Sequence, residues 1–220
     1  IDLAEKRVLP DPIIRFGIRK ACENRIRCEA EKSQPSFETA EVAFAKGMAQ
    51  GPIAFVPEKA NEQHYEMPPA FMKLALGARM KYSGCYWPDG VESLDRAEEQ
   101  SLAMVCDRAE VADGMTILEL GCGWGSLSLW MAEKYPNSQI VGVSNSSFQR
   151  EFIERRAREK GLNNLTIVTC DINQFDPGRS FDRVVSIEMF EHLWNYKELL
   201  HRISGWLNTD GKLFVHIFTH

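Results

Sequence analysis

The sequence predicts an α/β domain with a parallel sheet and helices on both faces, preceded by a helical extension. Strand-like and helix-like segments alternate from residue 115 onward, which is typical of parallel sheets with crossover helices. One strand-like run leads directly into three glycines at alternate positions. The first 60 residues are charged and carry apolar residues at helical spacing.

The N-terminal extension, residues 1–60, is predicted to hold two amphipathic helices ended by Gly51-Pro52. Their apolar stripes are Ile14, Ile18, Cys22 and Ile26, and then Phe37, Ala40, Phe44 and Met48. Two interpretations remain open: an appendage packed on a partner surface, or a lid over an active site.

A connector, residues 61–110, is rich in aromatic residues and prolines up to Pro88, and a helix capped by Ser93 follows. Its first part, residues 61–90, is either a packed connector or an ordered substrate loop. The core, residues 111–220, completes the predicted domain division. Its strands are expected at 115–120, 139–144, 165–169, 182–187 and 212–218, and its helices at 125–135, 147–160 and 196–207.

Composition excludes several classes of protein. The net charge of −5 and the pI of about 5.6 argue against nucleic-acid binding. The six cysteines are scattered without a CxxC pair, which indicates reduced thiols and a cytoplasmic location. The histidine spacing predicts no metal site, and no apolar run is long enough for a membrane segment. The expected partner is a small molecule, and a homodimer is left open.

The strongest motif is TILELGCGWGS, residues 116–126, in which a strand ends in a GxGxG turn before a helix. Glycines let backbone N–H groups approach a ligand, and the helix N-terminus favours an anion. Ser126 replaces the third glycine of a dinucleotide motif, which disfavours an NAD enzyme. Glu119 with Gly121, Gly123 and Gly125 resembles the first motif of class I methyltransferases. The resemblance implies a Rossmann-like fold whose glycine loop wraps the amino-acid end of S-adenosyl-L-methionine.

The second strand ends in VGVSNSSFQ without the usual ribose-binding acid. Ser144, Asn145 and Gln149 are predicted to supply neutral hydrogen bonds to the cofactor instead. For Gln149 the alternative is an exposed helical position. For Ser146 the expected role is a helix N-cap.

The stretch VGVSNSSFQ and the segment HYEMPPAFMKLALGARMKYSGCYW resemble the cyclopropane-fatty-acid synthase superfamily, and within it the plant coclaurine N-methyltransferases. The resemblance covers residues 58–220. It places Tyr82 and Ser83 at the cofactor, and Asp171 and Ile172 beside the adenine. Since methyltransferase sheets of this type normally have seven strands, two C-terminal strands are expected to be missing and the chain is predicted to be a fragment.

The catalytic prediction rests on SIEMFEHL, residues 186–193, after the fourth strand. If this stretch is helical, Glu188, Glu191 and His192 share one face. They would then attract a protonated amine and remove its proton before methyl transfer. The alternative is that Glu191 and His192 only cap and charge the next helix.

Two departures separate this chain from the lipid-modifying branch of the superfamily. Cyclopropane synthases resemble it in the Glu-His pair, but hold bicarbonate partly through a YSC cysteine and carry a small residue at position 188. This chain has Gly84, followed by Cys85, and it has Glu188. Both differences favour methylation of an amine.

An aromatic wall for a cationic amine is predicted from Tyr82, Tyr86, Trp87, Phe190 and Trp194, with core packing as the alternative for each. Tyr65, Tyr86, Trp87 and Phe190 are the expected substrate-binding residues. The predicted function is an S-adenosyl-L-methionine-dependent N-methyltransferase of a small aromatic or alkaloid-like amine. The alternatives are a cyclopropane-fatty-acyl-phospholipid synthase-type enzyme and a non-catalytic cofactor-binding module.

Overall fold

The computed structural model describes residues 2–6, 8–32, 37–55 and 69–218, and its chain divides into two compact units, Ile1–Gln50 and Gly51–His220. The first unit holds α1 (Asp2–Glu5), α2 (Asp11–Lys32) and α3 (Phe37–Met48). Both predicted helices are present, and the second ends before Gly51. Their apolar stripes are largely exposed to solvent, for example at Ile18, Ile26 and Phe44. Within the described parts of the chain, every helix is too short or too polar to cross a bilayer.

The second unit contains the α/β core. Its helices are α5 (Pro69–Ala75), α6 (Leu94–Arg108), α7 (Ser126–Lys134), α8 (Ser147–Glu159), the 3₁₀ helix η1 (Phe190–His192) and α9 (Tyr196–Trp206). Its strands are β1 (Thr116–Leu120), β2 (Gln139–Ser144), β3 (Leu165–Thr169), β4 (Phe181–Ile187) and β5 (Leu207–His216).

The five strands form one parallel sheet in the order β3-β2-β1-β4-β5. The chain moves outward from β1 through β2 to β3, and then returns to place β4 on the other side of β1. This reversal makes a topological switch point between β1 and β4. In open α/β sheets, ligands bind outside the carboxyl ends of the strands at such a point.

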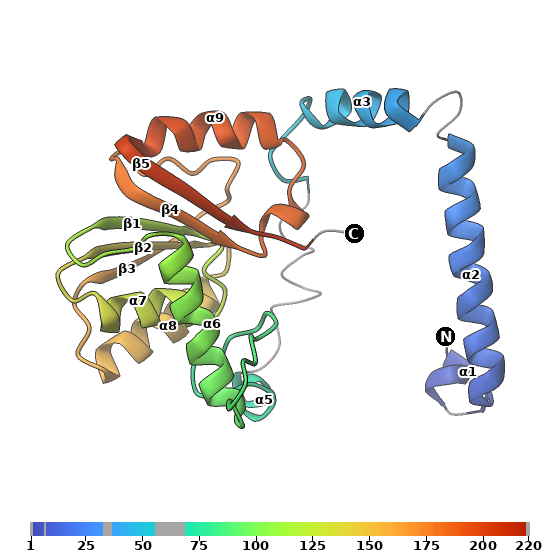
Figure 1. Ribbon diagram of the computed structural model, residues 1–220, viewed down its shortest axis with the longest axis horizontal. Coiled ribbons are helices and arrows are strands. Elements are labelled where there is room, and N and C mark those ends of the chain that lie inside the picture. Colours follow the sequence, from blue (N-terminus) through green and yellow to red (C-terminus); the bar gives the residue numbers. More distant parts are fainter. Residues whose placement is uncertain (1, 7, 33–36, 56–68, 219–220) are drawn as a thin grey trace. The chain divides into compact units, whose positions relative to one another are not determined.

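Helices cover both faces of the sheet, as predicted (Figure 1). On one face, Leu118 of β1 and Val184 of β4 are fully buried in a cluster with Leu199 and Ile203 of α9. On the other face, the alternate residue Ile117 packs in a cluster with residues of α6 and α7. Because neighbouring residues of a strand point to opposite faces, β1 contributes to both core layers.

Most predicted elements are confirmed within two residues. Ser93 caps α6 by accepting a hydrogen bond from the Arg96 N–H at 3.4 Å. The predicted start of the last strand is wrong, because β5 begins at Leu207 and not at residue 212. Leu207 pairs with Phe181, and a register irregularity between Phe181 and Arg183 separates this pair from the regular ladder. The predicted division at residues 60 and 110 stays a prediction.

Candidate functional site

A pocket of about 280 Å³ opens at the carboxyl ends of β1 and β4, at the switch point. This volume is near the lower end of the roughly 300–1,000 Å³ found for small-molecule sites. The lining residues come from α6, from Phe218, and from three segments, 80–83, 119–127 and 187–192. The fold therefore brings the glycine motif after β1 and the predicted catalytic stretch after β4 into one pocket, although they are about 65 residues apart in the sequence.

The wall that follows β1 is deeply buried. Glu119 is only 3% exposed and accepts a hydrogen bond from the Ser128 hydroxyl. Burial raises the pKa of the Glu119 carboxyl to about 7, which the Ser128 hydrogen bond opposes. Gly121 has a φ of +78°, and a side chain there would lie 2.9 Å from the Met189 side chain. Glycine at this position therefore lets the β1 loop approach the β4 wall.

The wall that follows β4 carries the predicted acid–base residues, and Glu188, Glu191 and His192 all line the pocket. The helical premise for their grouping is wrong. Glu188 has a φ of +52°, outside the helical region, and only Phe190–His192 form a 3₁₀ turn. The Glu188 N–H donates to the His216 carbonyl at 2.8 Å, so pairing with the end of β5 positions this residue.

The Glu188 carboxyl has a raised pKa because it is desolvated by burial. Lys81 and His216 act in the opposite direction, and the neighbouring Glu191 adds to the rise. A carboxylate with a raised pKa is a stronger base, which suits proton removal near neutral pH.

The η1 turn and the residues after it are held by hydrogen bonds to two backbone carbonyls. The Trp194 N–H donates to the Ile53 carbonyl at 2.7 Å, and the Tyr196 hydroxyl donates to the Phe190 carbonyl at 2.7 Å. Glu191 Oε1 accepts from the Phe218 N–H at 3.5 Å, whereas its buried Oε2 has no hydrogen-bond partner among the described residues. This oxygen is therefore an acceptor available to a ligand.

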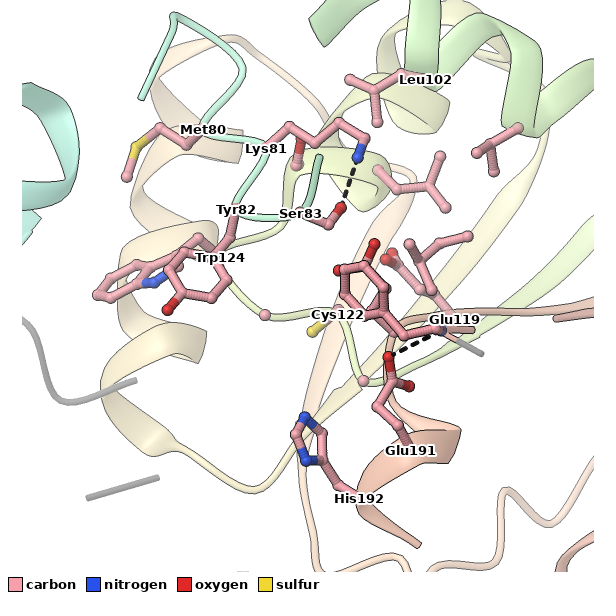
Figure 2. A pocket seen from close by; sticks show the side chains of 18 residues that line it. Met80, Lys81, Tyr82, Ser83, Leu102, Glu119, Cys122, Trp124, Glu191 and His192 are labelled. Atoms are coloured by element: carbon pink, nitrogen blue, oxygen red, sulfur yellow. Dashed lines mark hydrogen bonds between the residues drawn. The ribbon is translucent and has the colours of Figure 1, made fainter. Parts of the chain in front are cut away.

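The third wall, residues 80–83, brings Tyr82 and Ser83 to the pocket as the resemblance implied. It also brings Lys81, which sequence reasoning missed. Figure 2 shows Lys81 and Ser83 on the side of the pocket away from Glu191 and His192. A lysine is normally read as solvent-exposed, so its only sequence signal was its place beside Tyr82 and Ser83.

The remaining predicted cofactor residues are not among those that line this pocket. They are Gly125 of the glycine loop, Ser144 at the end of β2, Asn145 and Gln149 after β2, and Asp171 and Ile172 after β3. Gln149 is buried, so the exposed alternative for it is wrong; its Oε1 accepts from Ser144 Oγ at 2.7 Å. The predicted N-cap at Ser146 is confirmed. The Asp171 carboxylate accepts from the backbone and side-chain N–H groups of Asn173.

The predicted aromatic residues do not converge in the described part of the chain. Of the five wall candidates, only Tyr82 lines the pocket. Tyr86 and Trp87 are half exposed, Phe190 is buried in the core, and Trp194 packs edge-on against Phe55. Tyr65 lies outside the described residues. Substrate contacts by these residues stay predictions.

The parallel sheet, its switch-point pocket and the glycine loop define the class I methyltransferase, Rossmann-like fold, as predicted. The profile of the mycolic acid cyclopropane synthetase family matches residues 56–220. The chain belongs to this family, which confirms the resemblance found in the sequence.

Similar proteins fall in both branches of the superfamily. (S)-Coclaurine N-methyltransferase of Thalictrum flavum subsp. glaucum is 36% identical over 98% of this chain and 60% of its own length. Cyclopropane-fatty-acyl-phospholipid synthase of Escherichia coli K12 is 34% identical over 71% of this chain and 40% of its own length. The crystal structure of a coclaurine N-methyltransferase bound to N-methylheliamine and SAH has 35% identity and a TM-score of 0.85, over 98% of this chain and 62% of that one. The chain thus spans about 60% of the length of the N-methyltransferases that it resembles.

Proposed function

We propose that this chain binds S-adenosyl-L-methionine and belongs to an N-methyltransferase of a small aromatic or alkaloid-like amine. The observation that carries the proposal is one pocket that joins the glycine loop after β1 to Glu188, Glu191 and His192 after β4. The N-methyltransferase relatives support it, because they align along almost the whole chain. The cyclopropane synthase of E. coli aligns with less of it.

The described residues fit the cofactor. Ser126 and Trp124 line the pocket, and their buried Oγ and Nε1 atoms have no hydrogen-bond partner among the described residues. Gln149, which does not line this pocket, also has a buried Nε2 without a partner among those residues. Buried polar atoms without partners are unusual in proteins and point to a missing ligand. By the sequence resemblance, Tyr82, Ser83, Glu119 and the glycine loop would hold the amino-acid end, Ser144, Asn145 and Gln149 the ribose, and Asp171 and Ile172 the adenine.

When bound, the cofactor would supply an electrophilic methyl group on a sulfonium. An amine can attack only with a free lone pair, so a protonated amine must first lose its proton. The carboxylates of Glu188 and Glu191 lie in one pocket with the His192 imidazole, so they can attract an ammonium and accept its proton. Burial of Glu188 strengthens its basicity.

The test measures transfer of labelled methyl groups by the whole protein to a panel of benzylic amines and to unsaturated phospholipids. We expect transfer to amines, reduced about 10²- to 10⁴-fold in Glu188→Gln, as is typical when an acid–base group is lost. Glu110→Gln is the matched control, since Glu110 is an exposed carboxylate paired with Lys212 on the surface.

Other outcomes would replace the proposal. Label in lipid alone, with Glu188→Gln unaffected, would indicate a cyclopropane synthase-type activity. Cofactor binding without transfer to either class would indicate a non-catalytic module. The proposal includes a cytoplasmic location, which is supported by six cysteines that are all free thiols, and it leaves a homodimer open.

A further inference from the structure

Lys81 is a buried lysine inside the candidate site. The residue is only 6% exposed, lines the pocket, and donates from Nζ to Ser83 Oγ at 2.5 Å and to the Gly84 carbonyl at 2.6 Å (Figure 2). Lysine is rarely buried to this extent because desolvating an ammonium is costly. A buried charge in a pocket is therefore a candidate for a functional role.

The backbone of this wall is anchored without the Lys81 side chain. Glu98 of α6 is fully buried, and its carboxylate accepts from the backbone N–H groups of Gly77 at 3.0 Å, Arg79 at 2.8 Å and Lys81 at 3.0 Å. The Tyr86 N–H continues this attachment by donating to Ser101 Oγ at 2.6 Å. Since Asp95, Glu98 and Ser101 of α6 bind backbone N–H groups on both sides of Ser83, the Lys81 ammonium is not needed to hold residues 77–81 in place.

The ammonium donates to two neighbouring groups of the loop, the Ser83 hydroxyl and the Gly84 carbonyl. An ammonium has donors only, so the Ser83 oxygen must be the acceptor in their hydrogen bond. A hydroxyl that accepts from a cation becomes a stronger donor through its own hydrogen. Burial lowers the pKa of Lys81, while Cys85, Glu188 and Glu98 act in the opposite direction.

The pocket carries an acidic group as well as the cationic Lys81. Glu119, on the β1 wall, is a buried carboxyl that offers an acceptor to a cationic group, whereas Ser83 with Lys81 offers a polarised donor to an anionic group. The α-amino and α-carboxylate groups of an amino acid have this pairing of charges.

Building on the proposed function, we propose that Lys81 is a positioning residue that polarises the Ser83 hydroxyl to bind the carboxylate of the cofactor's amino-acid moiety. The role predicts selectivity between two ligands. S-adenosylhomocysteine carries the carboxylate, whereas 5′-methylthioadenosine has the same nucleoside and sulfur without the amino-acid group.

The experiment measures the dissociation constants of both ligands by titration calorimetry with the whole protein. Lys81→Met should weaken the binding of S-adenosylhomocysteine about 10- to 100-fold, as expected for the loss of a charge-assisted hydrogen bond. It should change the binding of 5′-methylthioadenosine by less than about twofold. Lys81→Arg should restore part of the loss, because it keeps the charge. Lys212→Met, which removes a lysine paired with Glu110 outside the pocket, should change neither ligand.

Ser83→Ala separates this role from a structural one. Like Lys81→Met, it should weaken the binding of S-adenosylhomocysteine and leave that of 5′-methylthioadenosine nearly unchanged. In the double variant, Lys81→Met should weaken S-adenosylhomocysteine binding by less than about a further twofold. If Lys81→Met does not fold, Lys81→Arg is compared with Ser83→Ala: because it keeps the charge, it should weaken the binding of S-adenosylhomocysteine less than Ser83→Ala does, and an equal loss would overturn the proposal. If the Lys81 variants bind both ligands equally weakly, or bind S-adenosylhomocysteine as tightly as wild type, the role of Lys81 is overturned. The proposed cofactor still stands in that case, provided that the wild-type protein binds S-adenosylhomocysteine. Wild type that binds no S-adenosylhomocysteine would overturn both.

Discussion

The wall after β1 and the wall after β4 place their side chains in the same pocket by different means. On the β1 wall, a regular strand ends in glycines, and Glu119 is fixed by deep burial and by Ser128. On the β4 wall, Glu188 is only partly buried and has a left-handed backbone conformation, and a short 3₁₀ turn follows it. The first wall is shaped by a local motif, whereas the second depends on contacts with distant segments such as His216 and Ile53.

The two walls meet at Gly121 and Met189, so a substitution at Gly121 is expected to have the largest effect on stability and activity. In Gly121→Ala the new methyl group would lie 2.9 Å from Met189, in addition to the unfavourable φ of +78°. We expect a loss of about 2–5 kcal/mol in the free energy of unfolding, from overpacking and backbone strain together. Displacement of Met189 should also lower methyl transfer, because Glu188 precedes it directly and Glu191 lies two residues after it. Urea denaturation and transfer assays measure both effects.

Gly123→Ala is the matched control for that substitution. Gly123 has a φ of +51°, but no atom lies within 4 Å of the position that a side chain would take. We therefore expect only the backbone cost of about 1–2 kcal/mol. Equal losses in the two variants would show that contact between the walls at Met189 is unimportant.

Glu119 gives the second effect, a pH dependence confined to the β1 wall. Burial raises the pKa of this carboxyl from its ordinary value of 4.5 to about 7. Between these values the folded state binds more protons than the unfolded state, so the free energy of unfolding falls as pH rises. The fall contributed by Glu119 should reach about 2.5 kcal/mol between pH 5 and pH 8, and Glu119→Gln should remove it. Denaturation at both pH values provides the measurement.

Glu110→Gln is the control for the pH experiment. The hydrogen bond from Lys212 holds the pKa of the Glu110 carboxyl below its ordinary value. A carboxyl with a lowered pKa loses its stabilising effect only as pH falls below the ordinary value, so this variant should keep the wild-type slope between pH 5 and pH 8. The same slope in wild type and Glu119→Gln would contradict the role assigned to burial.

Sequence reasoning succeeded where the signal is local. Strands such as β1 and β2 were predicted because their aliphatic residues form short runs bounded by turn residues, and the cap at Ser93 depends on neighbours three residues away. The start of β5 was missed because the pairing of Leu207 with Phe181 joins distant segments. Periodicity along one strand contains no information about such a pairing.

The same distinction applies to the candidate site. Glu119 and the glycine loop were predicted from adjacent residues, and Glu188, Glu191 and His192 were grouped in one pocket for the wrong reason. Their convergence comes from the left-handed turn at Glu188 and not from a helix face. Lys81 was missed because its burial depends on α6, whose Glu98 draws the 77–81 loop inward.

The smallest expected effect concerns the strain on the β4 wall. A left-handed conformation at a non-glycine residue costs about 1–2 kcal/mol, which glycine avoids because it has no Cβ. Only part of this cost is recovered, because glycine also makes the unfolded chain more flexible. We therefore expect Glu188→Gly to raise the free energy of unfolding by up to about 1 kcal/mol while methyl transfer is lost.

Glu110→Gly is the matched control, since Glu110 has the same φ of +52° at an exposed position outside the pocket. It should give a similar gain in stability with activity unchanged. Thermal unfolding and transfer assays on the two variants would separate strain from chemistry. A clear loss of stability in Glu188→Gly alone would mean that its carboxylate stabilises the pocket, and that the wall is not strained for function.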